Sequence, residues 1–171
     1  MDEENCFMTR DELLEKTLHS YAAYYDVNRT CPEEPFVAEA AFHSHNDAYF
    51  LVKSARIGEA ESNEYVFFAS VENLDRLFLE KLDATAWEKG ISRVQPHSNH
   101  RNTDISLIII ASSVTEDISK IVPRLKHYKS YRMSLHGFSH YRLYVVDLST
   151  GNQFCNSQGR SMKKLFSKIM A

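Results

Sequence analysis

The sequence is short of the residues that build flexible loops, bridges and phosphate-binding turns. Only five glycines and four prolines occur in 171 residues, which argues against long disordered linkers. The three cysteines, Cys6, Cys31 and Cys155, are an odd number without close spacing. Free thiols in a reducing compartment fit them best, with one disulfide left open. The chain also has no Gly-rich phosphate loop and no Cys-x-x-Cys pair, so it lacks the common nucleotide-binding and zinc-binding motifs.

Long hydrophobic runs are missing as well. The longest strongly apolar run, Ile105–Ala111, spans seven residues, whereas a membrane-spanning helix needs about 20. The first residues are acidic and polar, unlike the basic and then apolar start of a secretory leader. We therefore expect a cytoplasmic protein with no membrane partner.

The composition that is present is that of an ordinary globular chain. Hydrophobic residues make up 43% and aromatic residues 12%, enough for a sizeable core. The length fits one domain, and two full domains would be cramped. The sequence therefore predicts a single domain over residues 1–171.

Charge is distributed unevenly behind a net charge of −3. Residues 1–90 carry 19 acidic and 8 basic side chains, and residues 91–171 carry 4 acidic and 12 basic ones. Two interpretations are open. The halves form an acidic face and a basic face, or they interleave in one fold and neutralise each other.

Periodicity and turn residues predict the first half of the fold. The capping box Thr9–Glu12 begins a helix that should end near Asn28. Alternation then predicts a hairpin over Phe36–Ile57, with a turn at Asn46-Asp47 and a return strand at Tyr49–Val52. A polar loop (58–63), a third strand (65–69) and a helix over 71–89 capped by Gly90 follow.

The second half contains more strand than helix. After a loop at 93–103, the apolar run 105–111 predicts a strand buried on both faces. A helix over 115–127, strands over 131–135 and 141–148, a turn at 149–152 with a return strand near Phe154 and a helix over 161–170 complete the order. This order predicts an α+β fold with a mixed, mainly antiparallel sheet of about five to six strands flanked by three to four helices.

One cluster of histidines suggests a metal site. Residues two apart on a strand share a face, so His43 and His45 should project together, and Asp47 could add an oxygen ligand. His97 and His100, with Asp104, are the candidate donors from elsewhere. The same His-x-His pattern also fits a solvated hairpin end. The cofactor would be a divalent metal ion.

A basic and aromatic stretch from Lys120 to Arg142 is the second candidate. Cations neutralise phosphates or carboxylates, and exposed rings can stack on unpaired bases. The residues expected to contact a partner are Lys126, Lys129, Tyr131, Arg132, His140 and Arg142. The pI of 6.2 weighs against a dedicated nucleic-acid binder.

The predicted order helix, three strands, helix, strand over residues 9 to about 112 resembles the core of the PD-(D/E)xK nucleases. The resemblance implies an acidic residue on the second strand and an acidic-x-Lys triplet on the third, which together bind a divalent ion. Here the third strand offers Glu64-Tyr65-Val66 without a lysine, and Lys53 on the second has Leu51 two residues before it. The resemblance therefore covers element order alone and does not imply an active nuclease.

Three hypotheses follow, and the sequence does not decide whether the protein is an enzyme. The favoured one is a small non-enzymatic binding or regulatory domain whose basic aromatic segment 120–142 binds an acidic protein or a nucleic acid. The second is a metal-dependent hydrolase or degenerate nuclease-like domain that uses the histidine cluster. The third is a scaffold or homo-oligomer subunit without a site of its own.

Overall fold

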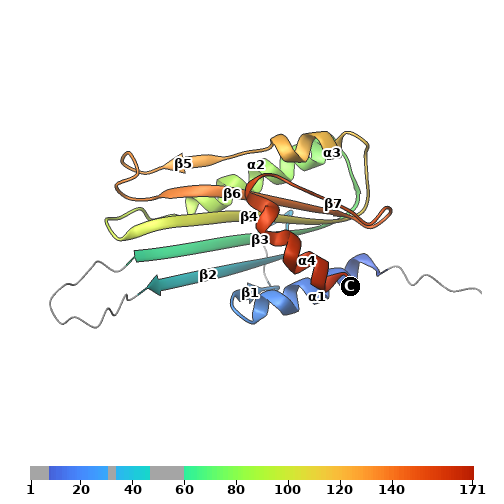
Figure 1. The fold of residues 1–171 in the computed structure, drawn as a ribbon, viewed down its shortest axis with the longest axis horizontal. Helices are drawn as coiled ribbons and strands as arrows, with labels where there is room; N and C mark the ends of the chain where they lie inside the picture. Colours follow the sequence, from blue (N-terminus) through green and yellow to red (C-terminus); the bar gives the residue numbers. More distant parts are fainter. Residues whose placement is uncertain (1–7, 31–33, 47–59) are drawn as a thin grey trace, which may run out of the picture.

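The computed structural model describes residues 8–30, 34–46 and 60–171. These residues form an α+β fold, with a seven-stranded mixed sheet and four α-helices (Figure 1). In chain order the elements are α1 (Arg10–Ala22), β1 (Asp26–Asn28), β2 (Ala38–Asn46), β3 (Ala60–Leu74), α2 (Arg76–Ser92), β4 (His100–Val114), α3 (Ile118–Ile121), β5 (Tyr128–Ser130), β6 (Phe138–Asp147), β7 (Asn152–Cys155) and α4 (Lys163–Ile169). Short 3₁₀ helices at Val122–Arg124 and Gln158–Met162 follow α3 and precede α4.

The sheet is mostly antiparallel but has a parallel centre. Its strand order is β1-β2-β3-β4-β6-β5, and β7 also pairs with β6. Strands β3, β4 and β6 run parallel, while every other pairing is antiparallel. Helix α2 is the crossover from β3 to β4, as parallel neighbours require. The predicted fold class is thus confirmed.

Helices cover both faces of the sheet, so the molecule has two hydrophobic cores. Helices α2 and α3 pack on one face, against side chains such as Leu107 and Ile109 of β4. Helices α1 and α4 pack on the other, where Ile108 and Ile110 of the same strand are buried (Figure 1). Successive residues of a strand point to opposite faces, so β4 is buried on both sides, as its apolar run predicted.

Helix α1 begins with the predicted capping box. The amide of Glu12 donates to the Thr9 hydroxyl at 3.2 Å, and the Glu12 carboxylate accepts from the Thr9 amide at 2.7 Å. The Thr9 amide and then the Thr9 hydroxyl, which both donate to the Glu12 carboxylate, lower the pKa of Glu12, because they favour its charged form. The helix ends at Ala22 rather than near Asn28, because Asp26–Asn28 pair with β2 as strand β1.

Strand β2 pairs with β3 in antiparallel fashion. The register runs from Ala38↔Phe68 to Asn46↔Ala60. Residues 60–63, predicted as a polar loop, belong to β3. The predicted return strand and Asp47 of the predicted turn lie outside the described residues.

Helix α2 starts later and ends later than expected. Residues 71–74 extend β3, and Asp75 is the N-cap, its carboxylate accepting from the amide of Phe78 at 2.8 Å. Gly90 lies inside the last turn instead of capping it. A Cβ at this position would come within 2.6 Å of the Ile105 side chain, so glycine permits the close approach of α2 to β4.

In the second half, one predicted strand is wrong. Residues 131–135 form a turn in which Arg132, Met133 and Ser134 all have positive φ, and the strand before it is β5. The helix expected over 115–127 is only α3 and a 3₁₀ turn containing Pro123. Strands β6 and β7 and helix α4 match predicted elements, whereas residues 100–103, predicted as part of a loop, belong to β4. No helix in the described part of the chain has the length and apolarity needed to cross a membrane.

Of the strands in the nuclease resemblance, the first and third correspond to β2 and β3, and the predicted second strand lies outside the described residues. The third of these strands, β3, carries Glu61, Glu64 and Glu72 but no lysine. The acidic-x-Lys triplet is therefore absent from the observed third strand too.

Candidate functional site

The sheet extends beyond the helices at the end where β3, β4 and β6 begin. Helices α1 and α4 lie over the opposite half of their face, and in Figure 1 no described helix lies in front of the left half of the sheet. The side chains on this open half-face include Ser62, Glu64, Asn102, Asp104, His140 and Arg142. It is the part of the sheet where polar side chains replace the apolar ones.

A charged network crosses the open half-face on three neighbouring strands. Arg142 on β6 donates to Asp104 on β4 at 2.5 Å and to Glu64 on β3 at 3.2 Å. The second Glu64 oxygen accepts from the Tyr25 hydroxyl at 2.6 Å, and Ser106 donates to the first at 2.7 Å. Glu64 and Asp104 are register partners on adjacent strands, so their carboxylates would repel each other. The positive charge of Arg142, which pairs with both, offsets this repulsion.

Burial changes the titration of this network. Desolvation raises the pKa of Asp104, partly opposed by Arg142 and reinforced by Glu64. Burial, and then the charge of Glu64, raise the pKa of Tyr25, so its hydroxyl stays protonated and donates to Glu64. The charged groups of the network thus form ion pairs and hydrogen bonds with one another, and these contacts hold the side chains in place on the sheet.

Aromatic rings continue the open half-face to its edge at β5. The rings of Phe138 and His140 lie 4.8 Å apart between centroids, and Tyr128 lies 5.2 Å from His140. The Tyr128 side chain is 59% exposed. A ring cluster of this kind offers flat apolar area to a partner.

The cations of the basic stretch divide between the two faces of the sheet. Lys129 is in register with Ser139, three residues before Arg142, so the two side chains project from opposite faces. Lys126, Lys129 and Arg132 are exposed, and within the described part of the chain none of them pairs with a carboxylate. We call these three residues the basic edge. Arg142 is not part of it.

The remaining predicted contact residues have fixed positions in the sheet. Tyr131 bonds through its hydroxyl to Ser139 at 2.9 Å and lies 5.7 Å below the Lys129 ammonium group. His140 belongs to the ring cluster. The predicted residues that lie on the sheet are therefore divided between its two faces and do not form one surface.

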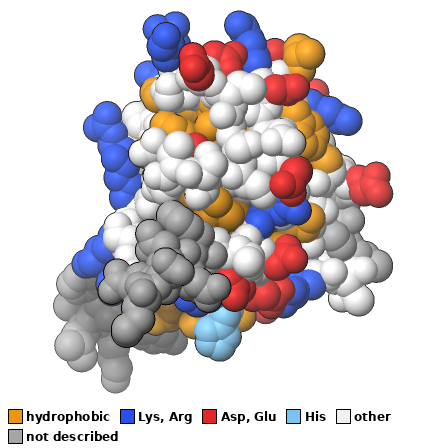
Figure 2. Space-filling model, turned by 90° about the vertical axis from the view of Figure 1, so that its right-hand side faces the viewer, with side chains coloured by type: hydrophobic (Ala, Val, Ile, Leu, Met, Phe, Trp, Pro, Cys, Tyr) orange, Lys and Arg blue, Asp and Glu red, His pale blue; other side chains and the backbone are white. Residues whose placement is uncertain are grey.

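Within the described part of the chain, three contacts through largely buried carboxylates join the acidic first half of the sequence to the basic second half. They are Arg142 with Glu64, Arg93 with Glu39 at 2.8 Å, and His127 with Asp83 at 2.7 Å. In each the carboxylate is largely buried. On the end of the molecule seen in Figure 2, acidic and basic side chains are interspersed. The two halves of the sequence therefore interleave inside the fold, and the basic edge carries positive charge that no carboxylate of the described residues neutralises.

The predicted metal ligands are held by other partners where the structure describes them. His43 bonds to Asn63 at 2.9 Å, and His97 bonds to Glu61 at 2.8 Å. Both ring nitrogens of buried His100 are occupied, by the His136 carbonyl and the Thr103 hydroxyl. Asp47 and the side chain of His45 lie outside the described residues. Among the residues that are described, no three metal-ligating side chains gather.

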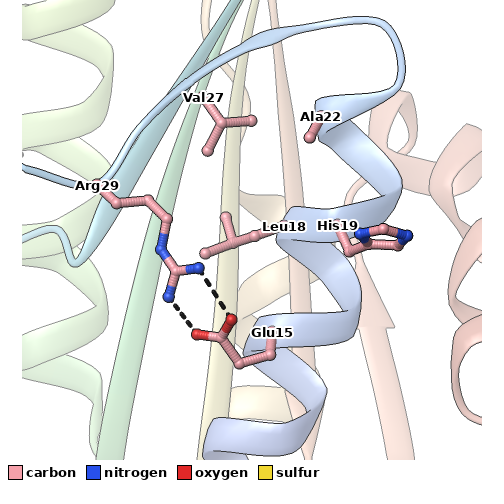
Figure 3. Close-up of a pocket in the computed structure, with 6 residues that line it drawn as sticks. All are labelled: Glu15, Leu18, His19, Ala22, Val27 and Arg29. Atoms are coloured by element: carbon pink, nitrogen blue, oxygen red, sulfur yellow. Dashed lines mark hydrogen bonds and ion pairs between the residues drawn. The ribbon is translucent and has the colours of Figure 1, made fainter.

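A shallow hollow of about 240 Å³ lies between α1 and β1, on the outer side of the molecule (Figure 3). Leu18, Ala22 and Val27 form its apolar wall. Arg29 spans it with a two-pronged ion pair to Glu15 (Figure 3). The volume falls below the usual range of about 300–1,000 Å³ for ligand pockets.

Sequence reasoning missed the charged network. The sequence pattern predicts Asp104 only as a metal ligand and Arg142 only as a contact to a partner. The sequence offers one signal for such a network: a charged residue, Glu64, directly precedes the apolar residues of a strand and shares a face with Val66. Which carboxylate meets Arg142 depends on strand order, which the sequence pattern does not carry.

The fold and this surface define a class of protein: a single α+β domain with a helix-covered mixed sheet and an open, polar and aromatic half-face. The family model described as "Domain of unknown function (DUF8052)" matches residues 9–168, and the chain belongs to this family. No curated protein and no solved structure matches the chain.

Proposed function

We propose that this domain is a non-enzymatic binding module whose basic edge and adjoining rings bind an acidic partner. The observation that carries the proposal is the basic edge itself. Lys126, Lys129 and Arg132 are exposed within seven consecutive residues, and the Tyr128 side chain among them in the sequence is 59% exposed. The sequence has no acidic residue between Asp117 and Asp147, so no neighbour along the chain cancels their charge.

The open half-face supports a binding role over a catalytic one. Its charged groups already pair with one another, and Arg142 neutralises the adjacent carboxylates. A general base needs a lone pair directed at the proton that it removes, and a metal ligand needs one directed at the ion. In this network Glu64 accepts three hydrogen bonds from within the protein, and Asp104 accepts one from Arg142.

Fluorescence anisotropy with two labelled polyanions tests the proposal. The probes are a single-stranded oligonucleotide and a glutamate-rich peptide. We expect at least one to bind, with an affinity that falls as salt rises, because exposed charges are screened. The triple variant Lys126→Ala, Lys129→Ala, Arg132→Ala should lose most of this binding.

A matched variant separates the basic edge from general charge. Lys163, Lys164 and Lys168 on α4 are also exposed, and their triple alanine variant removes the same three charges. It should bind the probe nearly as well as the unmodified protein. Equal losses in the two variants, or no binding of either probe by the unmodified protein, would refute the proposed function.

A further inference from the structure

The turn between β5 and β6 presents two apolar side chains to water. Met133 is 92% exposed and Leu135 is 77% exposed. They lie at the end of the sheet in the loop 131–137, which we call the tip (Figure 1). Exposed apolar residues are common singly, but two on one short turn beside a basic edge form a local feature.

The tip holds an unfavourable backbone conformation. Arg132, Met133 and Ser134 have φ values of 47°, 53° and 69°, a run of left-handed residues without a glycine. Non-glycine residues adopt this region rarely, and such strain persists only where the surroundings enforce it. We therefore expect contacts from the rest of the protein to hold the tip in this conformation.

Contacts behind the tip enforce this conformation. The His136 carbonyl accepts from buried His100 at 2.7 Å, and the amide of Tyr131 donates to the Gly137 carbonyl at 3.0 Å. Gly137 has φ of +80°, and a Cβ there would come within 2.4 Å of the Arg101 carbonyl oxygen. The base of the tip is thus fixed to β4, while its apolar side chains point outward.

The chemistry around the tip matches an anionic lipid surface. Arg132 lies in the tip itself, and Lys129 on β5 and Lys126 before it lead toward the tip along the chain. These cations would face lipid headgroups when Met133 and Leu135 enter the acyl region. The exposed ring of Tyr128 is of the type enriched at membrane interfaces. Two protruding apolar side chains beside cations can enter a fluid anionic bilayer directly. A protein partner would need an acidic pocket of matching shape.

We propose that the tip inserts Met133 and Leu135 into an anionic lipid surface while the basic edge binds the headgroups. This inference rests on the proposed function and names its acidic partner. It differs from the expectation of no membrane partner, which came from the lack of a spanning segment. Binding at a surface requires no such segment.

Co-sedimentation with vesicles tests the inference. The probes are phosphatidylcholine vesicles with and without about 30% phosphatidylserine, which supplies the negative surface potential. We expect binding to the anionic vesicles only, weakened by salt. Leu135→Ser should reduce it about tenfold, as expected for one apolar side chain lost from the hydrocarbon. The basic-edge triple variant should reduce it about a hundredfold.

Leu77→Ser is the matched control, because Leu77 on α2 has the same exposed fraction of 77% and lies outside the tip. It should bind vesicles like the unmodified protein. Equal losses for Leu77→Ser and Leu135→Ser, or no binding to anionic vesicles at all, would overturn the inference.

The two proposals fail differently. If a soluble polyanion binds through the basic edge but anionic vesicles do not bind, the lipid partner is wrong and the proposed function stands. A soluble polyanion whose binding depends on Leu135 would instead indicate a protein or nucleic-acid partner that contacts the tip. If neither probe class binds, both proposals fail.

Discussion

Arg142 and Arg132 are ten residues apart in one basic stretch, yet the fold places them in opposite situations. Arg142 lies on β6 within the sheet, where it pairs with Asp104 on the neighbouring β4 and with Glu64 on β3, one strand further away. Arg132 lies on the tip in a left-handed backbone conformation, exposed to solvent. The first cation neutralises the protein's own carboxylates, and the second is free to meet charge from outside. A count of basic residues therefore overstates the charge that a partner would encounter.

The comparison separates stability from binding. A partly buried ion pair contributes most visibly when one member is removed, because the other charge stays behind without compensation. An exposed cation contributes little to folding. The same type of residue should thus give large folding effects at the network and large binding effects at the basic edge.

The largest expected effect is loss of Arg142. Arg142→Met should lower the free energy of unfolding by about 3–5 kcal/mol, because Glu64 and Asp104 would face each other without a cation. Urea denaturation followed by circular dichroism measures it. Arg132→Met is the control and should change stability by less than about 0.5 kcal/mol. Adding Asp104→Asn to Arg142→Met should restore part of the loss, and no restoration would mean that like-charge repulsion is not its cause.

A somewhat smaller loss of stability tests whether packing of Gly137 against β4 fixes the tip. Gly137→Ala should destabilise the protein by about 2–4 kcal/mol, since its Cβ would meet the backbone of β4 at a positive φ. Gly151→Ala also has positive φ, but nothing lies within 4 Å of its Cβ. It should cost about 1 kcal/mol. Equal effects in thermal or urea unfolding would show that backbone angle alone matters and that the base of the tip is loosely packed.

A third prediction concerns pH. The pKa of Asp104 is raised in the folded protein, so its carboxyl binds a proton more tightly there than in the unfolded chain. Its stabilising contribution is complete below the ordinary aspartate pKa and is lost as pH rises through the raised value. Asp104→Asn should remove this fall, so the stability difference between variant and unmodified protein should change across that window. A constant difference in urea titrations at several pH values would contradict the assignment.

The smallest expected effect is on folding at the basic edge. The triple variant Lys126→Ala, Lys129→Ala, Arg132→Ala should unfold within about 0.5 kcal/mol of the unmodified protein, because exposed charges contribute little. Unfolding curves recorded beside the binding assays would check this. A large loss of stability would place these cations in the folded network and weaken the contrast with Arg142.

Much of the fold could be predicted where local rules act alone. The capping box at Thr9 and the doubly buried strand Ile105–Ala111 follow from side-chain chemistry and periodicity, and both are present. The pairing of β2 with β3 could not be predicted in the same way. It joins Ala38–Asn46 to residues 60–68, and contacts between segments separated in the sequence decide which strands meet.

The candidate site was predictable only in part. The basic edge and Tyr131 were visible as a charged, aromatic stretch, but the strand expected over 131–135 is a strained turn. Alternating Tyr131, Met133 and Leu135 imitates a strand pattern. The turn is fixed by contacts between residues more than 30 positions apart in the sequence. Gly137 packs against the Arg101 backbone, and His100 bonds to the His136 carbonyl.

By itself the sequence determined the composition of the core, the helix start at Thr9, the α+β class and the excess of cations after residue 90. Tertiary structure decided which cations are neutralised and which are exposed. The physical reason is that charge pairing depends on distances between strands that lie far apart along the chain. Glu64, Asp104 and Arg142 meet only because β3, β4 and β6 run parallel in one register.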